Sequence, residues 1–388
     1  MTLAADVCRR IAAAIGPAPA VLHEPEFAGR ERDYVRDCLD SGWVSSAGAY
    51  VDRFEAMLGE YTDSRAVATV NGTAALHLAL TLCDVAPGDE VLVPSLTFVA
   101  TANAVSYCGA TPHLVDSDPA TLCIDAERLN AYLETIADID GESCRNRQTG
   151  RPIRALVVVH LLGHPANMDA LQAICERFGL ALVEDAAESL GARWAGRHTG
   201  TVGRIGTLSF NGNKTITTGG GGAVLCRDSA LAARAKHLST TARIAAGPGF
   251  VHDAVGFNYR LPNINAALGC AQMERLDDAL ARKRSLAARY REAFKGFAGG
   301  VLVAEPAGGR SNWWLNALML APEHGGEQAG VIAASNEAGH MTRPAWTPMH
   351  RLPIYADCPR AALDGAEAIF SRLVCLPSSA SLARRADA

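Results

Sequence analysis

From about residue 66 to residue 185 the chain alternates short apolar runs with longer stretches of helical pattern. The apolar runs are rich in β-branched residues, and a turn separates most of them from the helical stretch that follows. The predicted strands are 67–70, 90–94, 111–115, 155–160 and 181–185, and the predicted helices are 74–83, 97–107 and 169–178. This succession of βαβ units predicts an α/β fold with a mostly parallel central sheet flanked by helices.

The carboxyl ends of the predicted strands are the first places to look for function. Ligands of open α/β sheets bind there, so the polar residues that follow each apolar run are candidates. These segments are 71–73, 94–98, 160–164 and 185–188.

Beyond residue 248 the pattern changes. A long helix-rich stretch, 264–294, is followed by mixed segments, which predicts a smaller C-terminal α+β domain. We therefore expect a large domain over 1–248 and a small domain over 249–388. The polar segment 138–151 has no periodicity, so we expect a surface loop or insertion there.

The N-terminal segment is expected to form a surface helix. Two arginines at 9–10 precede the apolar stretch 11–15, as in a signal peptide, but Asp6 lies before them and Pro17 follows closely. No apolar run approaches the ~20 residues that a membrane-spanning helix needs, so we expect no membrane segment.

The composition of the 388 residues is that of an ordinary soluble protein, with 49% hydrophobic and 20% charged residues. A net charge of −5 provides no basic field for nucleic acid or an anionic membrane. The eleven cysteines are scattered singly, without a C-x-x-C pair. This pattern predicts reduced thiols, no structural disulfides and a cytoplasmic location.

One lysine lies in a polar loop that leads into a run of glycines. Residues 209–218 read Ser-Phe-Asn-Gly-Asn-Lys-Thr-Ile-Thr-Thr, and residues 219–222 are all glycine. Successive glycines allow tight turns and close approach of the backbone, at a cost in backbone entropy. For this segment alone, a flexible hairpin tip that exposes Lys214 is an equally good interpretation.

Asp185 favours the functional interpretation. It ends an almost wholly apolar strand, and burying a carboxylate is costly without a cationic partner such as a protonated pyridine nitrogen. The strand-to-helix turn at 71–73 offers N–H groups and a helix dipole for a phosphate, and Phe98 can cover a planar ring. Together with Lys214, these features predict a site for pyridoxal phosphate.

At this point the sequence resembles the DegT/DnrJ/EryC1 family of nucleotide-sugar aminotransferases over almost its whole length. The segments that carry the resemblance are 41–45, 71–76, 94–98, 184–189, the Lys214 loop and 256–260. The resemblance implies a fold type I enzyme that depends on pyridoxal 5′-phosphate and shares its active site across a homodimer.

Some stretches are most similar to the aminotransferase of the legionaminic acid pathway, which acts on a nucleotide-linked 4-keto-6-deoxy N-acetylglucosamine. These stretches are 210–214 with the glycine run, 251–253, 261–272 and 341–346. Perosamine synthases carry a similar lysine loop and are the alternative subfamily.

The resemblance also implies roles for individual residues. Lys214 would bind the cofactor covalently and move protons, and Asp185 would keep the ring nitrogen protonated. The other cofactor contacts would be Gly72, Thr73 and Ser209 at the phosphate, Phe98 on the ring, Glu188 at the ring hydroxyl and Asn258 from the neighbouring subunit. Candidate substrate contacts are Trp43, Arg260, Arg343 and His350.

The expected reaction transfers an amino group from L-glutamate to C4 of a nucleotide-linked 4-keto-6-deoxy sugar. UDP-4-keto-6-deoxy-N-acetylglucosamine is the expected acceptor, and a 4-amino-4,6-dideoxy sugar is the product. A related sugar dehydratase would have histidine in place of Lys214. A non-catalytic, regulatory homologue would be free to lose Lys214, Asp185 or Thr73, and this chain has all three.

Two other kinds of site are not expected. His160 and His164 are four residues apart, but Gly163 and Pro165 break any helix that would bring them together as metal ligands. The glycine run lacks the G-x-G-x-x-G order of a dinucleotide-binding loop and does not follow the first strand.

Overall fold

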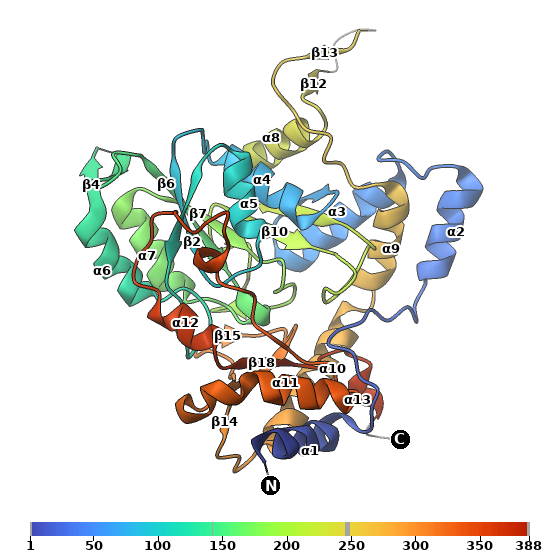
Figure 1. Cartoon of the computed structure of the whole chain (residues 1–388). Helices are drawn as coiled ribbons and strands as arrows, with labels where there is room; N and C mark the ends of the chain where they lie inside the picture. The colour runs from blue at the N-terminus through green and yellow to red at the C-terminus, as the bar shows by residue number, and fades with distance from the viewer. Residues whose placement is uncertain (1, 142, 245–248, 386–388) are drawn as a thin grey trace.

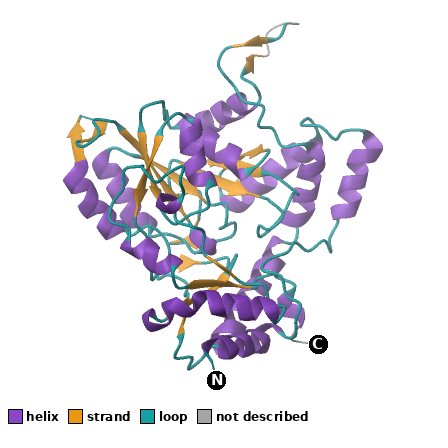
Figure 2. Ribbon diagram, viewed as in Figure 1, coloured by secondary structure: helices purple, strands orange, loops and turns teal. Residues whose placement is uncertain are grey.

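The computed structural model describes residues 2–141, 143–244 and 249–385, and Figure 1 traces the chain from its N-terminus in blue to its C-terminus in red. A central sheet lies among helices, and a smaller unit with its own sheet lies below it in this view (Figures 1 and 2). The central sheet has the strand order β1-β11-β10-β7-β6-β2-β3. Its strands are β1 Arg65–Thr69, β2 Glu90–Pro94, β3 Thr111–Val115, β6 Ile153–Val159, β7 Ala181–Asp185, β10 Ile205–Ser209 and β11 Gly222–Cys226.

The predicted mostly parallel sheet is confirmed. Strands β3, β2, β6, β7 and β10 pair in parallel, and β11 runs antiparallel to both β10 and β1. Every residue of β2 is buried, because the sheet is covered on both faces. This is why the central strands read as continuous apolar runs rather than as alternating patterns.

Four helices of the larger unit begin at a residue whose side chain caps one of their free N–H groups. The carboxamide of Asn71 accepts from the N–H of Ala74 at the start of α4, and Asp125 and Asn167 cap α6 and α7 in the same way. The helices of the larger unit are α2 Glu31–Ser41, α3 Ala49–Thr62, α4 Gly72–Leu82, α5 Ala100–Tyr107, α6 Ala126–Ile136, α7 Met168–Phe178, α8 Ser229–Ser239 and α9 Asn263–Met273.

The smaller unit contains an antiparallel sheet with the order β14-β16-β18-β17. Its strands are β14 Gly300–Leu302, β16 Asn316–Leu320, β17 Arg343–Pro344 and β18 Leu373–Leu376. The helices of the terminal parts of the chain are α1 Leu3–Ile15, α10 Leu276–Ala293, α11 Gln328–Glu337, α12 Asp364–Phe370 and α13 Leu382–Arg385. The predicted α+β character of this part is therefore present.

The segment 138–151 is more ordered than the sequence suggested. Strands β4 Ala137–Asp140 and β5 Ser143–Asn146 pair as an antiparallel hairpin instead of forming an irregular loop. Its inner side is anchored, because Asn146 is buried and donates to the carboxylate of Glu90 over 2.8 Å. A long-range contact of this kind leaves no periodicity in the sequence.

The proposed domain boundary at 248/249 stays a prediction. Two helices, one on each side of this boundary in the sequence, pack against the unit formed by the other side. Helix α1 is a helix at the surface, as expected, but Val7 and Ile11 are buried in one cluster with Leu286 of α10 and Val331 of α11. The N-terminal helix therefore packs on the smaller unit. Helix α9 follows residue 249 in the sequence but packs against α2 and α3 of the larger unit.

Among the described residues, no helix has both the length and the apolar character needed to cross a bilayer. All eleven cysteines are free thiols.

Candidate active site

A cavity of about 360 Å³ opens at the carboxyl ends of the central strands, beside the start of helix α4. The polar segments that follow β1, β2 and β7 meet there, as expected for an open α/β sheet. The sequence-predicted residues that line it are Gly72, Thr73, Phe98, Asp185, Glu188, Ser209, Lys214 and Arg343.

The start of α4 forms a seat for an anion. The first N–H groups of a helix have no partner within the helix, and they face the cavity at Gly72 and Thr73. A Cβ on Gly72 would lie 2.9 Å from the Cβ of Ser209, so only glycine lets the strand β10 approach this turn. A phosphate group fits this arrangement.

The second half of the glycine run is packed against its neighbours and is not a flexible tip. A Cβ on Gly222 would lie 2.6 Å from the carbonyl carbon of Asn71, and a Cβ on Gly221 would lie 2.2 Å from the Oγ1 of Thr218. Gly220 and Gly221 line the cavity. The run therefore brings the backbone of β11 against the anion seat, which removes the alternative of an exposed hairpin.

Lys214 lies in the turn between β10 and β11, with its side chain only 13% exposed. Its Nζ atom lies 3.6 Å from Oε1 of Glu188 and 4.2 Å from the centre of the Trp314 indole ring. The lysine head group is thus held between a carboxylate and an aromatic face inside the cavity.

Asp185 ends strand β7 and is buried. Its Oδ2 accepts a hydrogen bond from the Thr101 hydroxyl at 2.9 Å, and its Oδ1 accepts from the N–H of Ala187 at 3.2 Å. Burial raises the pKa of Asp185, and the hydrogen bonds and the charge of Lys214 offset this only in part. A cationic ligand group, such as a protonated ring nitrogen, would stabilise the ionised form of this carboxylate.

Glu188 is the second buried carboxylate of the cavity. Its Oε2 accepts from the N–H of Leu162 at 2.8 Å, and Leu162 presents this N–H from a left-handed backbone conformation with φ of 55°. Burial raises the pKa of Glu188, although the charges of Lys214 and Arg343 act in the opposite direction.

An aromatic wall closes one side of the cavity. Trp346 stacks on Trp314 with 6.1 Å between ring centres, and Phe98 meets Trp346 edge to face at 6.5 Å. Phe98 is 51% exposed, so its ring is open to a planar ligand. Trp314 was not predicted from the sequence, where the only signal was a pair of tryptophans after the polar residues 311–312.

Arg343 brings a second cation to the cavity. Its guanidinium lies 4.5 Å from the centre of the Trp346 ring, while its Nε atom is buried and has no hydrogen-bond partner in the described part of the chain. Lys214 and Arg343 are the only cationic side chains among the described residues that line the cavity. A buried donor without a partner, on the wall of a cavity, is suited to an anionic ligand.

Lys283 of α10 supports the aromatic wall from behind, and it too was missed in the sequence. Its ammonium is buried and donates to the carbonyls of Trp314 and Ser378, at 3.2 and 2.6 Å, and approaches Nε2 of His23 at 2.9 Å. Burial lowers the pKa of Lys283 to about 7. Because Lys283 lies in a charged helical stretch, its sequence context indicated only a solvent-exposed lysine.

Four predicted site residues lie outside the lining of this cavity in the part of the chain described. Trp43 is 60% exposed, and Arg260 donates to Oδ1 of Asn258 at 3.0 Å. His350 is held between the Ser95 hydroxyl and the Glu367 carboxylate, at 2.7 and 2.6 Å. Both ring nitrogens of His350 are therefore occupied by protein groups, and the roles given to these four residues stay predictions.

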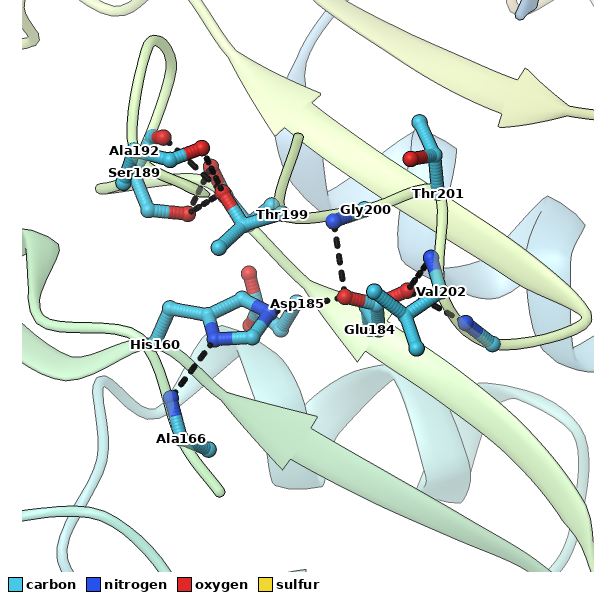
Figure 3. Close-up of polar contacts among 12 residues, drawn as sticks. His160, Ala166, Glu184, Asp185, Ser189, Ala192, Thr199, Gly200, Thr201 and Val202 are labelled. Carbon is cyan, nitrogen blue, oxygen red and sulfur yellow. Dashed lines mark hydrogen bonds and ion pairs between the residues drawn. The ribbon is translucent and has the colours of Figure 1, made fainter. Parts of the chain in front are cut away.

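His160 and Glu184 form a buried pair beside Asp185 (Figure 3). Glu184 accepts from Nε2 of His160 at 2.9 Å and from the N–H groups of Gly200, Val202 and Gly203. The N–H of Ala166 donates to Nδ1 of His160, so the ring proton is on Nε2.

Burial alone would raise the pKa of Glu184, but the hydrogen bond from His160 and those from the loop N–H groups bring it below its ordinary value. Because neighbouring residues of a strand face opposite sides, this network fixes the end of β7 from the side away from the cavity. His164 binds the Ser311 hydroxyl instead, so the two histidines have separate partners.

The model of the DegT/DnrJ/EryC1/StrS aminotransferase family matches residues 25–387. The chain belongs to this family. A GDP-perosamine synthase of Caulobacter vibrioides is 38% identical over 366 residues, which are 92% of each chain. A GDP-perosamine synthase of Escherichia coli O157:H7 is 37% identical over 339 residues, which are 87% of each chain.

Solved structures agree with this membership. The aminotransferase TlmJ of Streptoalloteichus hindustanus is 28% identical, with a TM-score of 0.83 over 93% of this chain and 94% of its own. The predicted enzyme class, fold type I architecture and pyridoxal phosphate cofactor are thereby confirmed. The anion seat, Asp185 and Lys214 fit the phosphate, the ring nitrogen and the aldehyde of this cofactor, respectively.

Proposed function

We propose that this sugar aminotransferase moves the amino group of L-glutamate to C4 of a nucleotide-linked 4-keto-6-deoxy sugar. The observation that carries the proposal is the meeting of Lys214, Asp185 and the start of α4 in one cavity. Bound pyridoxal phosphate supplies a carbon that carries the amino group and a ring that withdraws electrons. Residues of the protein bind and orient the reactants and move the protons.

Lys214 moves the protons. Its Nζ lies inside the cavity and is shielded by Trp314, so it can bind the cofactor and, once released, transfer a proton between the donor carbon and the cofactor. Glu188, at 3.6 Å, is a carboxylate that stabilises the released ammonium form. Asp185 would hold the ring nitrogen and favour its protonated form.

Arg343 binds the diphosphate of the nucleotide sugar. The buried Nε without a partner supports this role, as does the shortage of other cations on the cavity wall. Trp346 has one face towards Trp314 and lies close to the Arg343 guanidinium, so it holds the arginine in position rather than receiving a sugar ring.

A homodimer completes the site in this proposal. Asn258 and Arg260 lie in the loop that pairs with the end of β1, outside the cavity of their own subunit. We propose that Asn258 reaches the phosphate of the neighbouring subunit. The free thiols agree with a cytoplasmic enzyme.

For the sugar itself, the resemblance in the lysine loop favours UDP-4-keto-6-deoxy-N-acetylglucosamine, as in the legionaminic acid pathway. The similarity to two GDP-perosamine synthases favours a GDP-linked keto sugar as the second candidate. These acceptors differ in nucleotide and in the substituent at C2, so one assay can separate them.

The experiment is a two-step spectral titration of the purified holoenzyme. L-Glutamate is added first and should convert the cofactor band to that of the amine form; each keto sugar is then added separately. Restoration of the original band by one sugar identifies the acceptor, and the 4-amino sugar is verified by mass spectrometry. Failure of both sugars after a normal first step would contradict the proposed acceptor class.

A further inference from the structure

The carboxylate of Asp185 is connected to two buried threonine hydroxyls. Oγ1 of Thr101, in the first turn of α5, lies 2.9 Å from Oδ2 of Asp185. Oγ1 of Thr97, in the loop after β2, lies 3.0 Å from Oγ1 of Thr101. Both threonines are only 1% exposed, so water does not compete for these hydrogen bonds.

The chemistry of the groups fixes the direction of this chain of hydrogen bonds. An ionised carboxylate can only accept, so the single hydroxyl proton of Thr101 is donated to Asp185. The oxygen of Thr101 is then available as an acceptor, and Thr97 donates its own proton to it. Two aligned O–H dipoles therefore point towards the carboxylate.

Thr101 acts through Asp185 and not on the ligand. Thr97 and Ala100 line the cavity, whereas Thr101 lies behind them and is not among the described lining residues. The N–H of Ala187 holds the other oxygen, Oδ1, at 3.2 Å. Both oxygens of the Asp185 carboxylate therefore accept a hydrogen bond from the protein.

We propose that Thr101, backed by Thr97, is a positioning residue that keeps the Asp185 carboxylate ionised and directed at the cofactor ring nitrogen. The inference rests on the proposed function of Asp185. Burial raises the pKa of Asp185 and the Thr101 hydroxyl lowers it, so loss of the hydroxyl favours the neutral carboxyl group. A neutral carboxyl group holds a protonated ring nitrogen less strongly.

The test compares Thr101→Val, which removes the hydroxyl at almost constant volume, with Thr101→Ser, which keeps it. The dissociation constant of each apoenzyme is measured by spectral titration with pyridoxal phosphate and with its 1-deaza analogue, which has no ring nitrogen. We expect Thr101→Val to weaken binding of pyridoxal phosphate by about tenfold, since it loses a hydrogen bond to a charged group. Binding of the analogue should change by less than about twofold on the same reasoning.

Thr101→Ser should bind both compounds as the wild type does. An equal loss of affinity for both compounds in Thr101→Val would overturn the proposal, because it would indicate a general disturbance of packing. Wild-type affinity in Thr101→Val, or an equal loss in Thr101→Ser, would overturn it as well. These affinities are independent of the sugar assay, so failure of the acceptor proposal is recognised separately.

Discussion

The indole of Trp314 contacts the head group of Lys214 and the backbone of the residue before it. Its ring centre lies 4.2 Å from the lysine Nζ, and its N–H donates to the carbonyl of Asn213, the residue before the lysine, at 2.7 Å. One side chain therefore contacts both the head group of Lys214 and the peptide group that precedes it. Trp314 lies 100 residues further along the chain, on the loop that leads into β16.

Replacing Trp314 should slow the reaction of L-glutamate with the holoenzyme. Trp314→Phe keeps an aromatic face but loses the N–H, whereas Trp314→Leu loses both. A desolvated cation–π contact contributes about 2 kcal/mol, so we expect roughly a thirtyfold lower rate for Trp314→Leu and a smaller loss for Trp314→Phe. Stopped-flow absorbance measures the first step directly, and equal rates in all three proteins would contradict the role given to this ring.

Asp185→Asn should lower turnover without abolishing cofactor binding. The amide keeps the shape of the side chain but cannot stabilise a positive charge on the ring nitrogen. Loss of one preorganised charge of this kind costs on the order of 10² in rate. Steady-state turnover is compared with cofactor content per subunit, and near-normal turnover would show that the ring nitrogen does not depend on Asp185.

Arg343→Gln should raise the KM for the nucleotide sugar much more than it lowers kcat. The guanidinium makes charge-assisted hydrogen bonds to an anion, and their loss corresponds to about a tenfold change or more. The KM for L-glutamate serves as the internal control. A rise confined to the KM for glutamate would instead assign Arg343 to the carboxylate of the amino donor.

The stability of the protein should rise between pH 7 and pH 8.5 because of Lys283. The folded state lowers the pKa of this lysine from 10.5 to about 7, so in this range the unfolded chain binds a proton that the folded chain does not. The single group then contributes about 1 to 2 kcal/mol of increase in the free energy of unfolding.

Urea unfolding at the two pH values, in wild type and in Lys283→Met, isolates this contribution. His23 contacts the same ammonium, and burial lowers its pKa well below the ordinary value, so it stays neutral throughout the range. The methionine variant should lack most of the increase. An unchanged pH dependence in Lys283→Met would rule out this lysine as its source.

The sequence predicts the parts of the site that local pattern determines. Asp185 follows an apolar run, residues 71–73 join a strand to a helix, and Lys214 lies in a polar loop before glycines. Each of these features depends on neighbours in the chain, and parallel strand ends gather at one edge of a sheet. The sequence therefore predicts that these residues meet at one edge of the sheet.

The residues that support these groups could not be predicted in the same way. Thr101 resembles any threonine in a helix, and its partner Asp185 is 84 residues away. Lys283 looks like part of a solvated helix face until Ser378 and Trp314 are placed around it. Their environment arises only from tertiary packing, and the hairpin of β4 and β5 was missed for the same reason.

The packing of helix α1 determines when its apolar face can be buried during synthesis. Its apolar face is buried mainly against elements near the other end of the described chain, and Arg10 donates to the carbonyl of Ala293, 283 residues later. During synthesis, Val7, Ile11 and Ile15 therefore stay exposed until α10 and α11 have left the ribosome. Helix α1 is therefore synthesised long before the partners that bury its apolar face.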